Sequence, residues 1–98
     1  MATYVLLTKI EPEALKDPKS LEDLSRQVID KINQQCPEAK WIGSYATLGP
    51  YDFLDIFEAP DQATATKVAL IVRSFGHATT ETWSATPWED FQKIMRRM

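Results

Sequence analysis

The order of the predicted secondary-structure segments limits most strongly what this chain can fold into. Four segments rich in β-forming residues and two segments with helical apolar spacing follow one another as strand, helix, strand, strand, helix, strand. The strands are expected at residues 4–10, 40–48, 52–58 and 77–85, and the helices at residues 20–35 and 61–75. This is the split βαβ order. It predicts an α+β, ferredoxin-like βαββαβ fold with one four-stranded antiparallel sheet.

Local signals set the boundaries of these segments. Ser20 is expected to cap the first helix after a loop at residues 11–19, and Asp61 is expected to cap the second. Gly76 is a typical stop after a helix. Gly49-Pro50 leaves so short a link between the second and third strands that they must form an antiparallel hairpin.

A short third helix is predicted at the end of the chain. Thr86, Pro87 and Glu89 have the spacing of an N-cap hydroxyl, a proline at the first helical position and the glutamate of a capping box. Trp88, Phe91 and Met95 then share one side of this helix. We expect them to be buried.

Both faces of the predicted sheet are apolar. Right-handed crossovers place the two main helices on one face, so the other face needs a different cover. If side chains alternate strictly, the second strand has Trp41 and Tyr45 on one face and Ile42 and Ala46 on the other. The third strand likewise has Phe53 and Phe57 on one face and Leu54 and Ile56 on the other. Burying four such side chains is worth on the order of 6–12 kcal/mol, at ~1.5–3 kcal/mol each. We therefore predict a homodimer through the sheet face, a dimeric α/β barrel, with a monomer partly covered by the third helix as the alternative.

Composition excludes several classes of protein. The chain of 98 residues is expected to form one domain, 1–98, and its net charge of −3 comes without the basic stripe of a nucleic-acid surface. No stretch approaches the ~20 apolar residues that a membrane span needs. Cys36 is the single cysteine, so neither an internal disulfide nor a cysteine metal site is expected, and the cytoplasm is the default location.

The hairpin and its surroundings resemble the GYD domain family, which is named for a Gly-x-Tyr-Asp turn. The matching residues are LGPYDF at 48–53, EAPD at 58–61, Gly43 with Tyr45, and Gly76 with TET at 80–82. The resemblance implies a ferredoxin-like, dimeric α/β-barrel fold. It implies little about activity, because the family is largely uncharacterised, although related barrels include cofactor-independent monooxygenases, isomerases and haem-degrading enzymes. Asp55 and His77 depart from the usual pattern of the family.

The turn residues Gly49, Tyr51 and Asp52 have two interpretations. In the structural one, glycine and proline shape the turn and the aspartate binds backbone amides. In the functional one, Tyr51 and Asp52 lie at the mouth of a cavity between the sheet and the helices and orient a ligand.

Three titratable residues are candidate catalytic groups: Asp55, Glu81 and His77. Asp55 shares a strand face with Phe53 and Phe57, where burial of an unpaired carboxylate raises the pKa toward that of a general acid or base. A carboxylate paired across the sheet or the dimer interface is the structural alternative. His77, the single histidine, either interacts with a helix end or transfers protons, in a couple with Glu81.

Three aromatic residues, Trp41, Tyr45 and Trp83, complete the candidate binding site together with Tyr51 and Asp52. No phosphate loop, nucleophile elbow or zinc spacing is present, so no cofactor and no metal is expected.

These patterns predict a homodimer that binds a small apolar or aromatic molecule or has an assembly role. One alternative is a cofactor-independent monooxygenase or isomerase that uses a barrel carboxylate, and a further one is haem or metal binding through His77.

Overall fold

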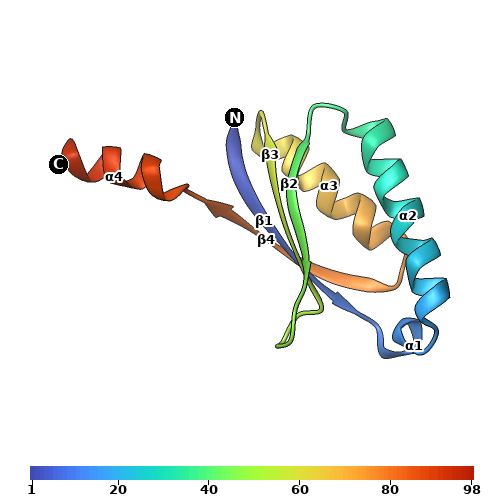
Figure 1. Cartoon of the computed structure of the whole chain (residues 1–98). Coiled ribbons are helices and arrows are strands. Elements are labelled where there is room, and N and C mark those ends of the chain that lie inside the picture. Colours follow the sequence, from blue (N-terminus) through green and yellow to red (C-terminus); the bar gives the residue numbers. More distant parts are fainter.

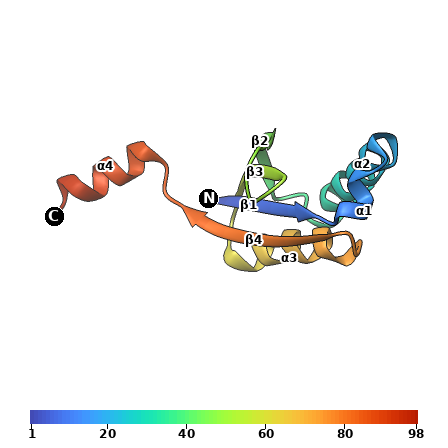
Figure 2. The same cartoon turned by 90° about the horizontal axis from the view of Figure 1, so that it is seen from below.

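A computed structural model describes all residues, 1–98, and confirms the predicted fold class. The sheet has four antiparallel strands in the order β2-β3-β1-β4. The elements are β1 Ala2–Ile10, α1 Pro12–Leu15, α2 Pro18–Gln35, β2 Lys40–Ala46, β3 Phe53–Ala59, α3 Gln62–Ser74, β4 Ala78–Ala85 and α4 Trp88–Arg96. Helices α2 and α3 lie on one side of the sheet, and α4 extends from the end of β4 on the side away from them (Figures 1 and 2).

The core lies between the sheet and α3. Phe57 and Val68 are fully buried, and Leu6 is 1% exposed. The Phe57 ring stacks on Tyr4 from β1 at a centroid distance of 5.6 Å and on Trp41 from β2 at 5.1 Å. Stacked aromatic rings contribute beyond the area that they bury. This row of rings therefore joins three strands on the helix side of the sheet.

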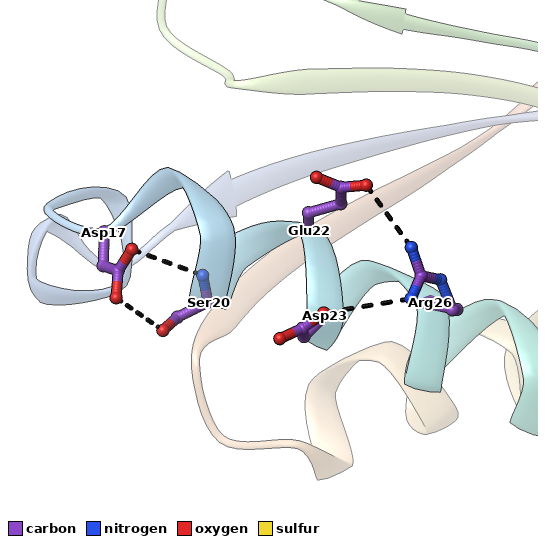
Figure 3. Close-up of polar contacts among 5 residues, drawn as sticks. All are labelled: Asp17, Ser20, Glu22, Asp23 and Arg26. Atoms are coloured by element: carbon purple, nitrogen blue, oxygen red, sulfur yellow. Dashed lines mark hydrogen bonds and ion pairs between the residues drawn. The ribbon is translucent and has the colours of Figure 1, made fainter.

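The start of α2 differs from the expected one. The helix begins at Pro18, and Asp17 rather than Ser20 is its N-cap. The Asp17 side chain accepts a hydrogen bond from the Lys19 amide and one from the Ser20 amide. The contacts with Ser20 are drawn in Figure 3. The Ser20 hydroxyl donates to Asp17 Oδ2 at 2.7 Å. These bonds, led by that of the Ser20 side chain, hold the pKa of the Asp17 carboxyl below its usual value. Proline at the first helical position and an aspartate before it form a stronger start signal than Ser20.

Residues 11–19 contain the short helix α1 where a loop was expected. The start of α3 agrees with the prediction. Asp61 accepts a hydrogen bond from the Thr64 amide at 2.8 Å, and Gly76 follows the helix at a φ of 79°. A positive φ is accessible to glycine at little cost, which explains the residue at this position.

A β-bulge in β2 contradicts the face assignment made from strict alternation. The register of β2 on β3 shifts between Trp41 and Gly43, so Ile42 is an extra residue. Trp41 is opposite Phe57 on the helix side, whereas Tyr45 is opposite Leu54 on the other side. Trp41 and Tyr45 therefore lie on different faces, because one inserted residue inverts the alternation beyond it.

Helix α4 is exposed, in contrast to the expected buried stripe. None of its residues is buried, and Trp88 is 66% exposed. The helix begins one residue later than the capping box implied: Pro87 is the N-cap, and no side chain caps the helix. In a single chain α4 therefore leaves the sheet face uncovered.

The whole molecule is extended. Its radius of gyration is 14.7 Å and its principal dimensions are 50 × 30 × 17 Å, whereas a compact domain of this length has a radius of about 13 Å. The extension of β4 and α4 beyond the body accounts for the difference (Figure 2). No helix is both long enough and apolar enough to cross a membrane.

Candidate functional site

A cleft of about 340 Å³ lies between the helix side of the sheet and α2. Its lining is mostly hydrophobic, and the polar residues among its 19 lining residues are Thr8, Ser25, Ser44, Asp55 and His77. Concave, mainly apolar sites with a few polar groups are typical of small-molecule binding.

The packing of α2 explains the cleft. Ile32 is the buried residue of this helix, whereas Leu21, Leu24 and Val28 are half-buried and face the cleft. On the sheet, the small residue Ala46 stands opposite Phe53. A helix whose apolar side chains are only partly covered, above a sheet with small residues, leaves unfilled space.

Asp55 is the carboxylate of the cleft. It lies between Leu6 on β1 and Ser44 on β2. The Trp41 indole Nε1 donates to Asp55 Oδ1 at 3.3 Å and to Ser44 Oγ at 2.9 Å. Burial raises the pKa of the Asp55 carboxyl above its usual value, and hydrogen bonds from Ser44 and Trp41 oppose the rise. The expected position beside Phe53 and Phe57 is confirmed, and no lysine or arginine is paired with the carboxylate.

His77 borders the same cleft, near the end of β1. Its Nδ1 lies 3.8 Å from Glu11 Oε2, and its carbonyl accepts a hydrogen bond from the Glu11 amide at 2.9 Å. Glu81 is on the sheet face opposite to the helices, so the predicted couple of His77 with Glu81 is wrong: the partner is Glu11. No group of three or more histidine, cysteine, aspartate and glutamate side chains is arranged to hold a metal ion.

Tyr51 and Asp52 lie outside the lining of the cleft. Asp52 Oδ2 accepts a hydrogen bond from the Ile10 amide at 2.7 Å, and the Asp52 amide donates to the Thr8 carbonyl at 2.9 Å. The Tyr51 carbonyl accepts from the Thr47 hydroxyl at 2.7 Å. The Tyr-Asp pair thus attaches the hairpin to the end of β1, which supports the structural interpretation of the turn. The carboxylate binds a neighbouring strand rather than amides of its own turn.

The open face, which we define as the sheet surface opposite to α2 and α3, carries the remaining candidates. Tyr45 is 58% exposed and Trp83 is 51% exposed on this face. The Trp83 indole donates to Glu81 Oε1 at 3.2 Å. The Tyr45 ring folds back over Gly43, where a Cβ would approach it to 3.3 Å, although Tyr45 also borders the cleft. Trp83 and Glu81 do not, so the predicted site residues divide between the two sides of the sheet.

Sequence reasoning missed part of the cleft. The apolar spacing of Leu21, Leu24 and Val28 puts them on one side of the predicted helix without showing that they line a cleft, and nothing local places Ser44 beside Asp55. The spacing of the apolar residues predicts that they share one side of the helix, but it does not predict how closely that side packs on the sheet. Ser44 could not be placed because its side of the strand depends on the bulge at Ile42.

The fold, the open face and the cleft define a class of small ferredoxin-like α+β proteins. Within this class the chain belongs to the GYD domain family, whose model matches residues 4–95. The resemblance seen in the hairpin is thereby confirmed.

One relative is the "Glutamine synthetase and cystathionine beta-lyase binding protein" of Thermus thermophilus, 28% identical over 94 residues that cover 92% of this chain and 94% of the relative. Two solved structures share the fold. FFRP-DM1 is 20% identical with a TM-score of 0.57 over 88% of this chain and all of that one. The Arabidopsis thaliana protein At3g17210 is 14% identical with a TM-score of 0.58 over 89% and 95% of the two chains.

Proposed function

We propose that this protein is a small binding protein that works as a homodimer and associates with a larger enzyme. The observation that carries the proposal is the uncovered open face. Val5, Leu54 and Ile56 are half-buried at its centre, and Tyr45 and Trp83 are exposed around them. A soluble monomer rarely exposes a contiguous apolar surface of this kind, which is typical of an interaction site.

A second copy is the occupant that fits the open face. The surface is a sheet, and two sheets pack face to face about 10 Å apart with their side chains interdigitated. Across a two-fold axis, each copy would contribute the same apolar residues to the contact, as an isologous interface requires. Fully buried aromatic side chains lose about 150–250 Å² each, so Tyr45 and Trp83 from both copies would contribute a large share of a standard interface.

Helix α4 extends the same interface. The apolar stripe consists of Trp88, Phe91, Ile94 and Met95 on α4 and of Met98 just beyond its end. All of these side chains are exposed, and α4 lies on the side of the sheet away from α2 and α3 (Figure 1). A copy seated on the open face would lie next to this stripe. We infer that α4 is an arm that packs on the second copy.

Light scattering tests the dimer. We expect the wild-type protein to have twice the chain mass of 11.2 kDa. Ile56→Lys should give the monomer mass, because an unpaired charge would be buried at the centre of the interface. Leu70→Lys, on the exposed side of α3, is the matched control and should remain dimeric. A wild-type monomer at micromolar concentration would contradict the proposal.

The name of the Thermus thermophilus relative supports association with an enzyme. We therefore propose a partner of the glutamine synthetase or cystathionine beta-lyase kind, in the cytoplasm, as the single cysteine predicts. Sedimentation of the protein with each purified enzyme measures this directly. Comigration with either enzyme but not with an unrelated oligomer of similar size is the expected result, and no comigration with either contradicts this part of the proposal.

The cleft supports binding of a small apolar or aromatic molecule as a second function. Its volume of about 340 Å³ is at the lower end of the range of ligand sites, ~300–1,000 Å³. A monooxygenase or isomerase would use Asp55 in this cleft as its acid or base, because Glu81 lies on the other face. Haem or metal binding through His77 gains no support, since Glu11 is its one ionisable partner.

A further inference from the structure

The cleft combines an apolar lining with one carboxylate and no cation. Its polar residues contribute hydroxyl groups, an imidazole and the Asp55 carboxylate, and none of the 19 lining residues is a lysine or an arginine. Buried or partly buried carboxylates in proteins are ordinarily paired with a cation or several hydrogen-bond donors. Asp55 has neither.

The hydrogen bonds of Asp55, from the Ser44 hydroxyl and the Trp41 indole, leave part of its accepting capacity unused. A carboxylate accepts about four hydrogen bonds. The Trp41 Nε1–H at 3.3 Å is shared with Ser44 Oγ, which lies closer to it at 2.9 Å, so Asp55 receives the weaker part of a divided bond. No backbone amide donates to this carboxylate, in contrast to Asp17, Asp52 and Asp61.

The shape of the cleft limits the size of a ligand. Along β1 it extends from Leu6, which is opposite Asp55, to Ile10, beside His77. Four residues of strand span about 13 Å. A body of one aromatic ring or a short alkyl chain fits this length and the volume of about 340 Å³.

We propose that the cleft binds small apolar amines, with the ammonium group on the Asp55 carboxylate and the apolar body between α2 and the sheet. The proposal rests on the small-molecule function proposed above and names its ligand class. An ammonium supplies the charge that the carboxylate lacks, and a charge-assisted hydrogen bond is roughly twice as strong as a neutral one. A carboxylic acid of the same size would place two negative charges together, and an alcohol would provide the hydrogen bond without the charge.

Calorimetry with three matched probes tests the proposal on the full chain. The probes are 2-phenylethylamine, 2-phenylethanol and 3-phenylpropionate, which share the apolar body and differ in the head group. We expect the amine to bind at least tenfold more tightly than the alcohol, and the acid not to bind measurably. Equal binding of amine and alcohol would overturn the amine inference while leaving a small-molecule site in place.

Two variants locate the site. Asp55→Asn keeps the size of the side chain and should weaken amine binding at least tenfold while leaving alcohol binding unchanged. Asp30→Asn makes the same charge change at an exposed position on α2 outside the cleft and should leave amine binding unchanged. Ser25→Trp fills the cleft from an exposed position on α2 and should abolish binding of both probes.

The outcomes separate this inference from the proposed function. If the amine binds Asp55→Asn as tightly as it binds wild type, the inference is overturned, wherever the amine binds. If no probe binds the wild-type protein, the amine inference and the small-molecule function both fail. The dimer and the enzyme partner are unaffected, since light scattering and sedimentation measure them without any probe.

Discussion

At the scale of single residues, Asp52, just before β3, and Asp55, within it, show how neighbouring carboxylates can have different surroundings. They are three positions apart. Asp52 accepts a hydrogen bond from a backbone amide of β1, whereas the Asp55 side chain lines an apolar cleft. Direct backbone hydrogen bonds make Asp52 a structural residue. Asp55 accepts no backbone hydrogen bond, and it is the carboxyl to which we assign the proposed ligand.

The raised pKa of Asp55 predicts how its replacement changes stability with pH. Folding favours the protonated form of this carboxyl, so its contribution to stability is fully present below the ordinary pKa of 3.8 and is lost as the pH rises through the raised value. Asp55→Asn cannot ionise. We therefore expect the free energy of unfolding of the variant, relative to wild type, to improve as the pH increases from acid to neutral.

Urea unfolding at a series of pH values measures this, with Asp30→Asn as the exposed control on α2. A difference between Asp55→Asn and wild type that stays constant with pH would show that burial does not penalise the Asp55 charge.

Asp52 has the opposite role, and its loss should weaken the fold. The Ile10 amide donates to the Asp52 carboxylate at 2.7 Å, and Asp52→Ala removes this acceptor. Hydrogen bonds to charged groups contribute about 1.5–3 kcal/mol, so we expect a loss of that size in the free energy of unfolding. Asp52→Asn retains an acceptor and should lose less. The hypothesis that this residue attaches the hairpin to β1 fails if both variants unfold like wild type.

Residue-level predictions from sequence succeeded where the neighbours were local. The helix cap at Asp61 and the helix stop at Gly76 follow from residues within a few positions along the chain. The partner of Asp52 is 42 positions away, and the side of β2 on which Ser44 lies depends on one inserted residue. Nothing in the local sequence specifies either.

At the scale of elements, the order and type of the strands and main helices could be predicted, because alternation, helical spacing and turn residues all agreed. The end of β2 could not. The pattern through Leu48 looks like strand, but β2 ends at Ala46, and Leu48 projects into solvent from the hairpin turn. Helix α2 gains further local order from Arg26, which lies 3.3 Å from Glu22 and 3.9 Å from Asp23 (Figure 3). Exposed ion pairs of this kind contribute little to stability.

Helix α4 is the element whose surroundings the sequence could not supply. Its amphipathic pattern predicts that one side of the helix is buried. In a single chain that side is exposed, so the prediction can hold only if another molecule covers it. The double variant Trp88→Ser, Phe91→Ser should raise the dimer dissociation constant at least tenfold, since each aromatic side chain contributes about 1.5–3 kcal/mol when buried. Analytical ultracentrifugation measures the constant.

Lys93→Ser, on the polar side of α4, is the control and should bind like wild type. An unchanged dissociation constant for the double variant, with a dimeric wild type, would mean that α4 lies free of the second copy.

At the scale of the whole molecule, one chain buries little of itself. Only 14 of 98 residues are buried, and the main core cluster of 10 residues lies on the side of the sheet that α2 and α3 cover, although Leu7 is buried on the open face. Small domains are marginally stable because a short chain buries a limited fraction of its surface. The apolar open face and α4 therefore represent surface that an assembly can use for stability.

If folding is coupled to assembly as proposed, thermal stability depends on protein concentration. If the native chain is stabilised by a second copy, the melting temperature must rise with protein concentration, because association favours the folded state by mass action. We expect a steady rise for the wild-type protein between about 1 and 100 μM, and a flat profile for Ile56→Lys, whose charge at the proposed interface should prevent pairing. Leu70→Lys should follow wild type, since its substitution lies on the other side of the molecule. A wild-type melting temperature independent of concentration would mean that one chain alone supplies all of the stability, and the apolar open face would then need a different occupant.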